Sequence, residues 1–160
     1  MSFTSTVLEN NPNIGAGEVL AGSVNNVSAY DTFEDGLVMG RFVKFDTGSI
    51  DNLDASATPV IAGIAKRKIT NEIGGTTYTT SGQSIDQMAE VINFGFATVT
   101  VTDAADPSKY DAVNVINAAG ADAGKGTEAA VAAGIISAGD VVFWEQKAAN
   151  TWLVRINKFL

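Results

Sequence analysis

The stretch Ala89–Val101 reads AEVINFGFATVTV, and its apolar residues change sides of the strand midway. They are first even-numbered and then odd-numbered: Ile92, Phe94, Phe96, Val99 and Val101. Successive side chains of a β-strand point to opposite faces, so a one-residue slip moves every later side chain to the other face. The strand must therefore bulge or bend between the two sets, and Gly95 and Ala97, with little or no side chain, are the expected place. A long strand of this kind serves two sheets at the corner of a sandwich or barrel.

Strand signals recur along the rest of the chain, separated by clusters of Gly, Asn, Asp and Ser. The predicted strands are residues 19–24, 38–45, 60–66, 76–80, 90–102, 110–116, 140–145 and 151–160. The last is the clearest, because Trp152, Val154, Ile156 and Leu160 fall on one parity while Arg155 and Asn157 fall on the other. A chain of 160 residues with this many short strands is predicted to be mostly β, a jelly-roll-like sandwich or a partly closed β-barrel.

One or two short helices are expected beside the strands. Ser84 and Gln87 have capping-box spacing ahead of Met88 and Val91, which favours a helix there. Thr127 could cap a second helix over residues 128–133, which Gly134 would end. The Ala/Gly-rich segment 118–133 as a whole is interpreted as a loop insertion with one helical piece.

The first 17 residues read MSFTSTVLENNPNIGAG and follow neither the helical nor the strand period. We interpret residues 1–17 as an extended N-terminal arm and residues 18–160 as a single β domain. A frayed terminus is the general expectation for a chain end, but the large apolar residues of this segment are costly to leave in water. An arm that packs on a neighbouring molecule would cover them. The candidate contact residues of the arm are Phe3, Leu8, Pro12 and Ile14.

The chain contains no histidine and no cysteine, which removes the commonest acid–base group and the commonest thiolate nucleophile together. A structural or binding role is therefore favoured over an enzymatic one. Paired carboxylates can hydrolyse glycosides without histidine, and Glu90, Asp140 and Glu145 are the candidates, but nothing in their spacing pairs them. We expect no enzyme activity and no cofactor.

The net charge and the low fraction of charged residues indicate which kind of partner the protein binds. The net charge of −8 argues against direct contact with nucleic acid, which attracts Lys and Arg. Only 18% of the residues are charged, and such a surface suits broad contact with other proteins because few charges must be desolvated. Neither a signal peptide nor a membrane-spanning run is visible, so synthesis in a cytoplasm and no membrane contact are expected.

Three further patterns suggest chemistry and have simpler explanations. The run AAGADAGKGT, residues 118–127, resembles a phosphate-binding loop, but its glycines have the wrong spacing and Gly126 separates Lys125 from Thr127. Two groups of aspartates could offer oxygens to calcium, although turn-forming Asp is the simpler reading. They are Asp46, Asp51 and Asp54, and Asp103, Asp106 and Asp111. Trp144 and Trp152 could form a platform for sugars, while their alternation with apolar residues favours packing.

One basic run, Lys66, Arg67 and Lys68, ends the predicted strand 60–66. Charges at a strand end usually protect the sheet edge and keep the protein soluble. They could also meet an acidic neighbouring subunit, and residues 1–40 of this chain, with five carboxylates and no Lys or Arg, are acidic enough to be one. These three residues complete the set of candidate contacts.

Five segments together resemble the cement, or decoration, proteins of tailed-bacteriophage capsids. They are GRFVKFD (40–46), PVIAGIA (59–65), AEVINFGFATVTV (89–101), PSKYDAVNV (107–115) and GIISAGDVV (134–142). The shared order is an entering strand with a polar arm, a G-x-x-V strand, a G-I-A strand, a valine-rich strand that ends in a turn, then Y-x-x-V-x-V and a late G-x-V. The resemblance spans most of residues 18–145, and the acidic arm and the segment 118–133 fall outside it.

This resemblance implies a jelly-roll-like protein that is not an enzyme. It implies a dimer or trimer that bridges subunits of the major capsid protein on the outer surface of the virion and stabilises the head. A carbohydrate-binding or fibre-type β domain of a virion is the alternative, and it would need Trp144 or Trp152 exposed beside Asp and Asn.

Overall fold

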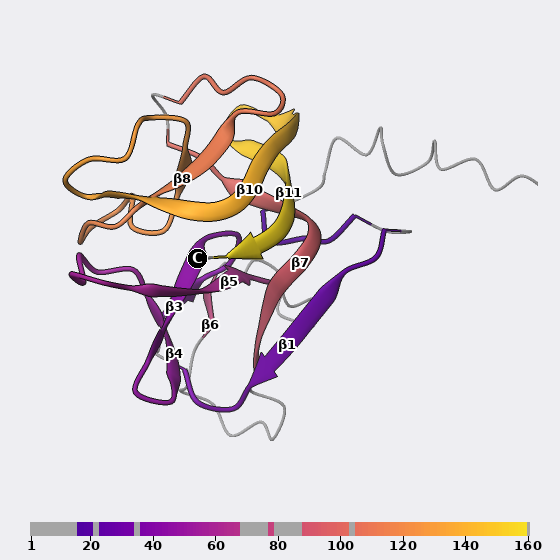
Figure 1. The fold of residues 1–160 in the computed structure, drawn as a ribbon. Helices are drawn as coiled ribbons and strands as arrows, with labels where there is room; N and C mark the ends of the chain where they lie inside the picture. The colour runs from indigo at the N-terminus through magenta and orange to yellow at the C-terminus, as the bar shows by residue number, and fades with distance from the viewer. Residues whose placement is uncertain are drawn as a thin grey trace, which may run out of the picture.

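The computed structural model describes residues 16–20, 23–33, 36–67, 77–78, 88–102 and 105–159. Regular structure in these residues consists of eleven strands and no helix (Figure 1). The strands are β1 (Asn26–Tyr30), β2 (Leu37–Val38), β3 (Phe42–Asp46), β4 (Ser49–Asn52), β5 (Val60–Ala65), β6 (Thr77–Tyr78), β7 (Ala89–Thr100), β8 (Ala112–Ile116), β9 (Gly126–Thr127), β10 (Ile135–Ala148) and β11 (Thr151–Phe159). The prediction of a mostly β fold is confirmed.

Nine of the strands form one curled antiparallel sheet. The strand order is β4-β3-β5-β7-β11-β10-β8-β9, with β1 paired to β7 beside this path. A parallel bridge between Val101 and Gly126 brings β9 back to the end of β7. The half of the sheet that contains β8, β9, β10 and β11 thereby closes with β7 into a small barrel. The half that contains β3, β4 and β5 stays open, so the sheet is a partly closed barrel.

Strand β7 bends at Gly95, as its sequence predicts. The backbone of Gly95 has φ +99°, and the register of β7 passes there from β1 and β5 to β11. Ile92 before the bend and Val99 after it are both fully buried in the same cluster, so the buried face changes parity between them. The side-chain oxygen of Asn25 accepts a hydrogen bond of 2.8 Å from the Phe96 N–H and satisfies the backbone that the bend exposes.

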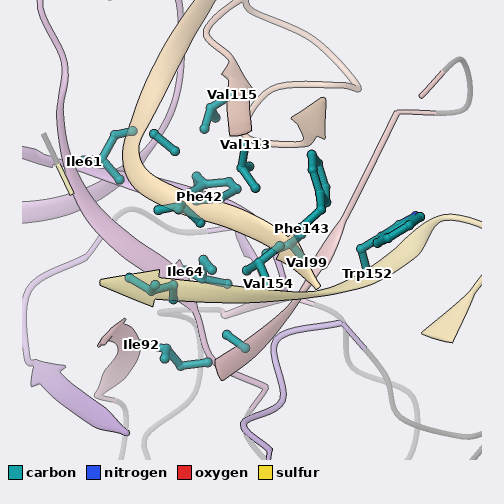
Figure 2. Close-up of a cluster of buried hydrophobic side chains, with 14 of the residues drawn as sticks. Phe42, Ile61, Ile64, Ile92, Val99, Val113, Val115, Phe143, Trp152 and Val154 are labelled. Atoms are coloured by element: carbon teal, nitrogen blue, oxygen red, sulfur yellow. The ribbon is translucent and has the colours of Figure 1, made fainter. Parts of the chain in front are cut away.

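Two apolar clusters lie on opposite faces of the open half of the sheet. The larger one fills the barrel, and Figure 2 shows Phe42, Ile64, Phe143 and Val154 within it. The smaller one takes the alternate residues of the same strands. Its buried members are Leu37, Val43, Ile50, Ala62, Ala65, Ala89 and Val91. Since β3, β5 and β7 are covered on both faces, their sequences are nearly continuous apolar runs.

The helix predicted over residues 128–133 is wrong. Gly126 and Thr127 pair with β8 as β9, and Thr127, 4% exposed, accepts a hydrogen bond from the Ala129 N–H. Sheet pairing with a distant segment overrides the helical preference of the alanines that follow. In the other predicted helix, residues 79–87 lie outside the described residues, and Val91 belongs to β7.

Several strand boundaries differ from the prediction. In the described part of the segment 19–24, Val19 forms an isolated bridge to Ala97, and the strand itself comes later, as β1. The predicted strand 38–45 is two strands, β2 and β3, separated by a turn at Gly40 with φ +76°. Strand β4, with one buried apolar residue in four, gave no recognisable pattern.

Candidate functional site

The N-terminal segment is fixed to the sheet at residues 16–20, which we call the arm root. The Gly17 N–H donates to the Thr98 carbonyl at 2.7 Å, and the Thr98 N–H donates to the Glu18 carbonyl at 2.8 Å. The Glu18 N–H also donates to Thr98 Oγ1 at 2.8 Å. With the bridge from Val19 to Ala97, the arm root continues along β7 beyond the point where β1 leaves it.

Gly17 and Gly40 let four backbone segments meet at the arm root. The Arg67 N–H donates to the Gly17 carbonyl at 2.7 Å, and the Thr100 N–H donates to the Gly40 carbonyl at 2.8 Å. A Cβ on Gly17 would lie 2.7 Å from the Ala65 carbonyl oxygen and 2.7 Å from the Gly40 nitrogen. These contacts are with backbone atoms, which cannot rotate away. Only glycine fits at residue 17, whose φ is +83°.

Two residues of the basic run form ion pairs near the arm root, and one of these pairs, Arg67 with Glu18, involves the arm root itself. Lys66 Nζ lies 2.9 Å from Glu90 Oε2, and Arg67 Nη1 lies 3.5 Å from Glu18 Oε1. All four side chains are partly exposed, so each pair adds little stability. The acidic partner of Arg67 comes from the leading segment of the same chain. The basic run thus meets the acidic segment within one molecule, and contact of the run with a neighbouring subunit stays a prediction.

The other predicted contact residues lie outside the described residues. They are Phe3, Leu8, Pro12, Ile14 and Lys68. Ala16 fixes the point on the domain from which residues 1–15 start, beside β7 and the end of β5.

The three candidate catalytic carboxylates each have a separate partner. Glu90 pairs with Lys66, Asp140 accepts from Asn157 Nδ2 at 3.1 Å, and Glu145 lies 2.7 Å from Lys147 Nζ. The structure does not bring them together around a shared site. Within the described ranges, no group of three or more Asp or Glu side chains could hold a metal ion, and no helix is long and apolar enough to cross a membrane.

The Asp46, Asp51 and Asp54 group surrounds a lysine. The Lys44 side chain is 6% exposed, and its Nζ lies 2.8 Å from Asp54 Oδ1, 2.9 Å from Ser56 Oγ and 3.9 Å from Asp46 Oδ2. The hydrogen bond to Asp54 raises the pKa of Lys44, and it lowers the pKa of Asp54. The carboxylates that could have bound calcium thus neutralise a buried ammonium group and fix the loop after β4.

The loop that resembles a phosphate-binding loop uses its backbone amides internally. The Gly124 N–H donates to the Ile116 carbonyl at 2.9 Å, and the Lys125 N–H donates to the Asp122 carbonyl at 3.0 Å. Lys125 Nζ also lies 2.7 Å from Asp122 Oδ1. The Phe42 N–H donates to the Gly124 carbonyl at 2.8 Å, so the loop connects the barrel to β3. Its amides are not arranged around a phosphate.

The two tryptophans have different environments. Trp152 is 8% exposed and packs edge-to-face on Phe143, with ring centroids 5.5 Å apart, inside the large cluster (Figure 2). Trp144 is only partly buried and contacts Phe96, Tyr110, Lys109 and Arg155 at the surface. The sequence did not distinguish the two rings, because both alternate with apolar residues, and it gave no signal for the residues around Trp144.

Comparison with known proteins identifies one family. A family model described as "XM1 gp53 minor capsid protein" matches residues 3–158. A chain of the solved structure "The capsid of Myoviridae Phage XM1" is similar to this chain with 64% identity and a TM-score of 0.87, over 100% of both chains. No curated protein matches significantly.

Proposed function

This chain belongs to the XM1 gp53 minor capsid protein family, and we propose that it acts as a cement protein that bridges neighbouring subunits of the phage capsid. Family membership establishes a structural protein of a phage capsid, located in the virion. The bridging, the contact with the major capsid protein, the position on the outer surface and the self-association are our proposal.

The arm root is the observation that carries the proposal. Fifteen residues precede Ala16, and a fully extended chain of that length reaches about 50 Å. The chain that follows them is fixed at once by backbone hydrogen bonds to β7 and by the close approach at Gly17 and Gly40. If the first fifteen residues bind a second capsid subunit, any force on that contact is transferred directly to β7, the central strand of the sheet. That arrangement suits a link between two bodies better than a frayed terminus does.

The composition of the arm supports contact with protein. Phe3, Leu8 and Ile14 are apolar, and Glu9 is the only charged side chain among the first fifteen residues. Such a segment has little charge to desolvate when it is covered, and burial of its large side chains contributes roughly 1.5–3 kcal/mol each. We propose that these residues, with Pro12, contact a neighbouring capsid subunit, and that Lys68 lies near the same contact.

The charge distribution supports a position on the outside of the shell. A net charge of −8 disfavours contact with packaged DNA. The separate partners of Glu90, Asp140 and Glu145 support the inference that this protein is not an enzyme.

Deletion of residues 1–15 tests the proposal. We expect the deleted protein to keep its cooperative unfolding transition and to lose at least about tenfold in affinity for capsids that lack the minor capsid protein, because a large apolar contact is removed. Cosedimentation with purified capsids measures the affinity. The matched control replaces Phe3, Leu8 and Ile14 by Ser in the full-length chain, and it should approach the effect of the deletion. Attachment of the deleted protein with unchanged affinity would refute the arm as the bridging element.

A further inference from the structure

The N-terminal segment follows one edge of β7 in two stretches. β1 pairs antiparallel with residues 89–94 of β7 (Figure 1). The arm root continues along the same edge past the bend, with Val19 bridged to Ala97. Because the two strands run antiparallel, Ala16 lies toward the C-terminal end of β7. A pull on the preceding residues therefore reaches the arm root before it reaches β1.

Hydrogen bonds across the strands hold the arm root on β7. Thr98 is 1% exposed and bonds to the arm root through its N–H, its carbonyl and its hydroxyl. The Leu20 N–H donates to the Phe96 carbonyl at 3.3 Å, and the Arg67 N–H donates to the Gly17 carbonyl. The bonds of an antiparallel pair lie perpendicular to the strands. A pull along the strand therefore strains all of them together, whereas a pull away from β7 strains them one after another.

Apolar burial contributes little to the attachment of the arm root. Of its residues, only Gly17 is buried, and Ala16, Glu18, Val19 and Leu20 are partly exposed. The hydrophobic effect has no direction, whereas hydrogen bonds and backbone contacts do. The resistance of the arm root to a pull should therefore depend on the direction of that pull.

The space around Gly17 also prevents the arm root from sliding along β7. A Cβ at this place would lie 2.7 Å from the Ala65 carbonyl oxygen and 2.7 Å from the Gly40 nitrogen. If a pull moved the segment toward the N-terminus, Glu18 and then Val19 would take the place of Gly17. Each of these residues carries a Cβ, and the backbone atoms around the site cannot rotate away. The narrow site at Gly17 therefore stops a movement along the strand and has no such effect on a movement away from it.

We propose that the arm root is a direction-dependent clamp. It resists a pull along β7, because its hydrogen bonds are strained together and because only glycine fits at residue 17. It yields to a pull away from β7, which breaks the same bonds in sequence. The inference rests on the proposed function, in which residues 1–15 bind a neighbouring capsid subunit and carry force. The clamp sets the direction in which that link between two subunits is strong.

Single-molecule force spectroscopy on the full-length chain tests the clamp. The chain has no cysteine, so two introduced cysteines define both attachment points. Ser2→Cys supplies the attachment on the N-terminal side. Met88→Cys, at an exposed residue directly before β7, makes the pull run along the strand. Ala149→Cys makes it run across β7, because this exposed residue lies in the turn after β10, where the Asn150 carbonyl accepts from the Val101 N–H.

The release of the arm root should be slower in the pull along the strand. At equal force we expect a release rate at least about tenfold lower than in the pull across β7, because two or more hydrogen bonds, each worth roughly fivefold, must break together. The event is recognised as a gain in length of at most about 30 Å, the reach of residues 17–24, before the rest of the domain unfolds.

A pair of double variants tests the stop at Gly17. Glu18→Gly with Val19→Gly removes both Cβ atoms, and Glu18→Ala with Val19→Ala is the matched control that loses the same side chains and keeps each Cβ. In the pull along the strand, the glycine variant should release at least about fivefold faster than the alanine variant, because the collision is gone. Across β7 the two should differ much less, since the added backbone freedom of glycine acts in both directions alike.

Equal release rates of the wild type in the two directions, or faster release along the strand, would overturn the proposal. So would a glycine variant whose release relative to the alanine variant is the same in both directions. The wild-type comparison needs no change in the arm root, so it decides the question even if a double variant does not fold. Because this assay contains no capsid, its failure is distinct from a failure of capsid attachment through residues 1–15.

Discussion

Substitution of Gly95 by Ala should destabilise the fold strongly, because the bend in β7 leaves no room for a side chain. The backbone there has φ +99°, and a Cβ would collide with the Val24 carbonyl oxygen and the Asn25 side-chain oxygen. Occupation of positive φ costs roughly 1–2 kcal/mol, and overpacking against fixed atoms costs roughly 1–3 kcal/mol more. Ala lowers the entropy of the unfolded chain, which offsets about 0.4–1 kcal/mol.

Gly48→Ala is the matched control. Gly48 has φ +85° at the hairpin tip, and no atom lies within 4 Å of a Cβ built there. Gly48→Ala has the same cost of positive φ and the same effect on the unfolded chain as Gly95→Ala. The difference between the two variants in the free energy of unfolding therefore measures the collision at Gly95, about 1–3 kcal/mol. For a chain of this length that difference corresponds to roughly 2–12 °C in Tm.

Urea unfolding followed by tryptophan fluorescence measures both variants. The free energy of unfolding should fall clearly more for Gly95→Ala than for Gly48→Ala, with similar slopes. Equal losses would refute the reasoning, because they would mean that the bend accepts a side chain and that β7 does not depend on glycine to change its buried face.

Two other predictions concern the loop after β4 and the arm root. The pKa of Asp54 is lowered by Lys44, so the stability from this pair is present above the unfolded carboxyl pKa of about 3.9 and is lost as the pH falls through the lower folded value. Asp54→Asn should therefore show a shallower loss of stability on acidification than the wild type in urea titrations at several pH values, and an unchanged slope would contradict this. Gly17→Ala places a Cβ 2.7 Å from backbone atoms of two neighbouring segments, so it should weaken capsid attachment as the deletion of residues 1–15 does. If the Gly17→Ala variant cosediments with capsids at wild-type affinity, capsid attachment does not depend on the packing of the arm root.

The bend in β7 could be read from the sequence because its cause is local. A change of parity from Ile92 to Val99 requires an irregularity, and the glycine between them shows where it lies. The parity rule needs no knowledge of the rest of the fold. The strands with long apolar or alternating patterns, such as β5, β8 and β11, were predictable for the same reason.

Elements that depend on distant pairing could not be read in this way. Strand β9 has two residues and exists because β8 and the end of β7 bond to it from either side. Its neighbours in sequence are alanines, whose helical preference gave the wrong prediction for residues 128–133. Strand β4 likewise depends on its pairing with β3, since only Ile50 in it is fully buried.

The contact surfaces were predictable only in part. The sequence indicated an acidic partner for the basic run, but Arg67 meets Glu18 only because the arm root and the end of β5 cross beside Gly40. The contacts of Trp144 draw on β7, β10, β11 and the turn before β8, which no spacing rule brings together. Residues that converge from distant segments require the fold itself.

The most direct test of the capsid-bridging role is an electron cryo-microscopy reconstruction of the phage head that carries this protein. The domain should lie on the outer surface of the shell. Density for the residues before Ala16 should run from the arm root along β7 to a neighbouring capsid subunit, with Phe3, Leu8 and Ile14 in contact with it. A domain that lies on the shell while its first fifteen residues touch no other subunit would contradict the account.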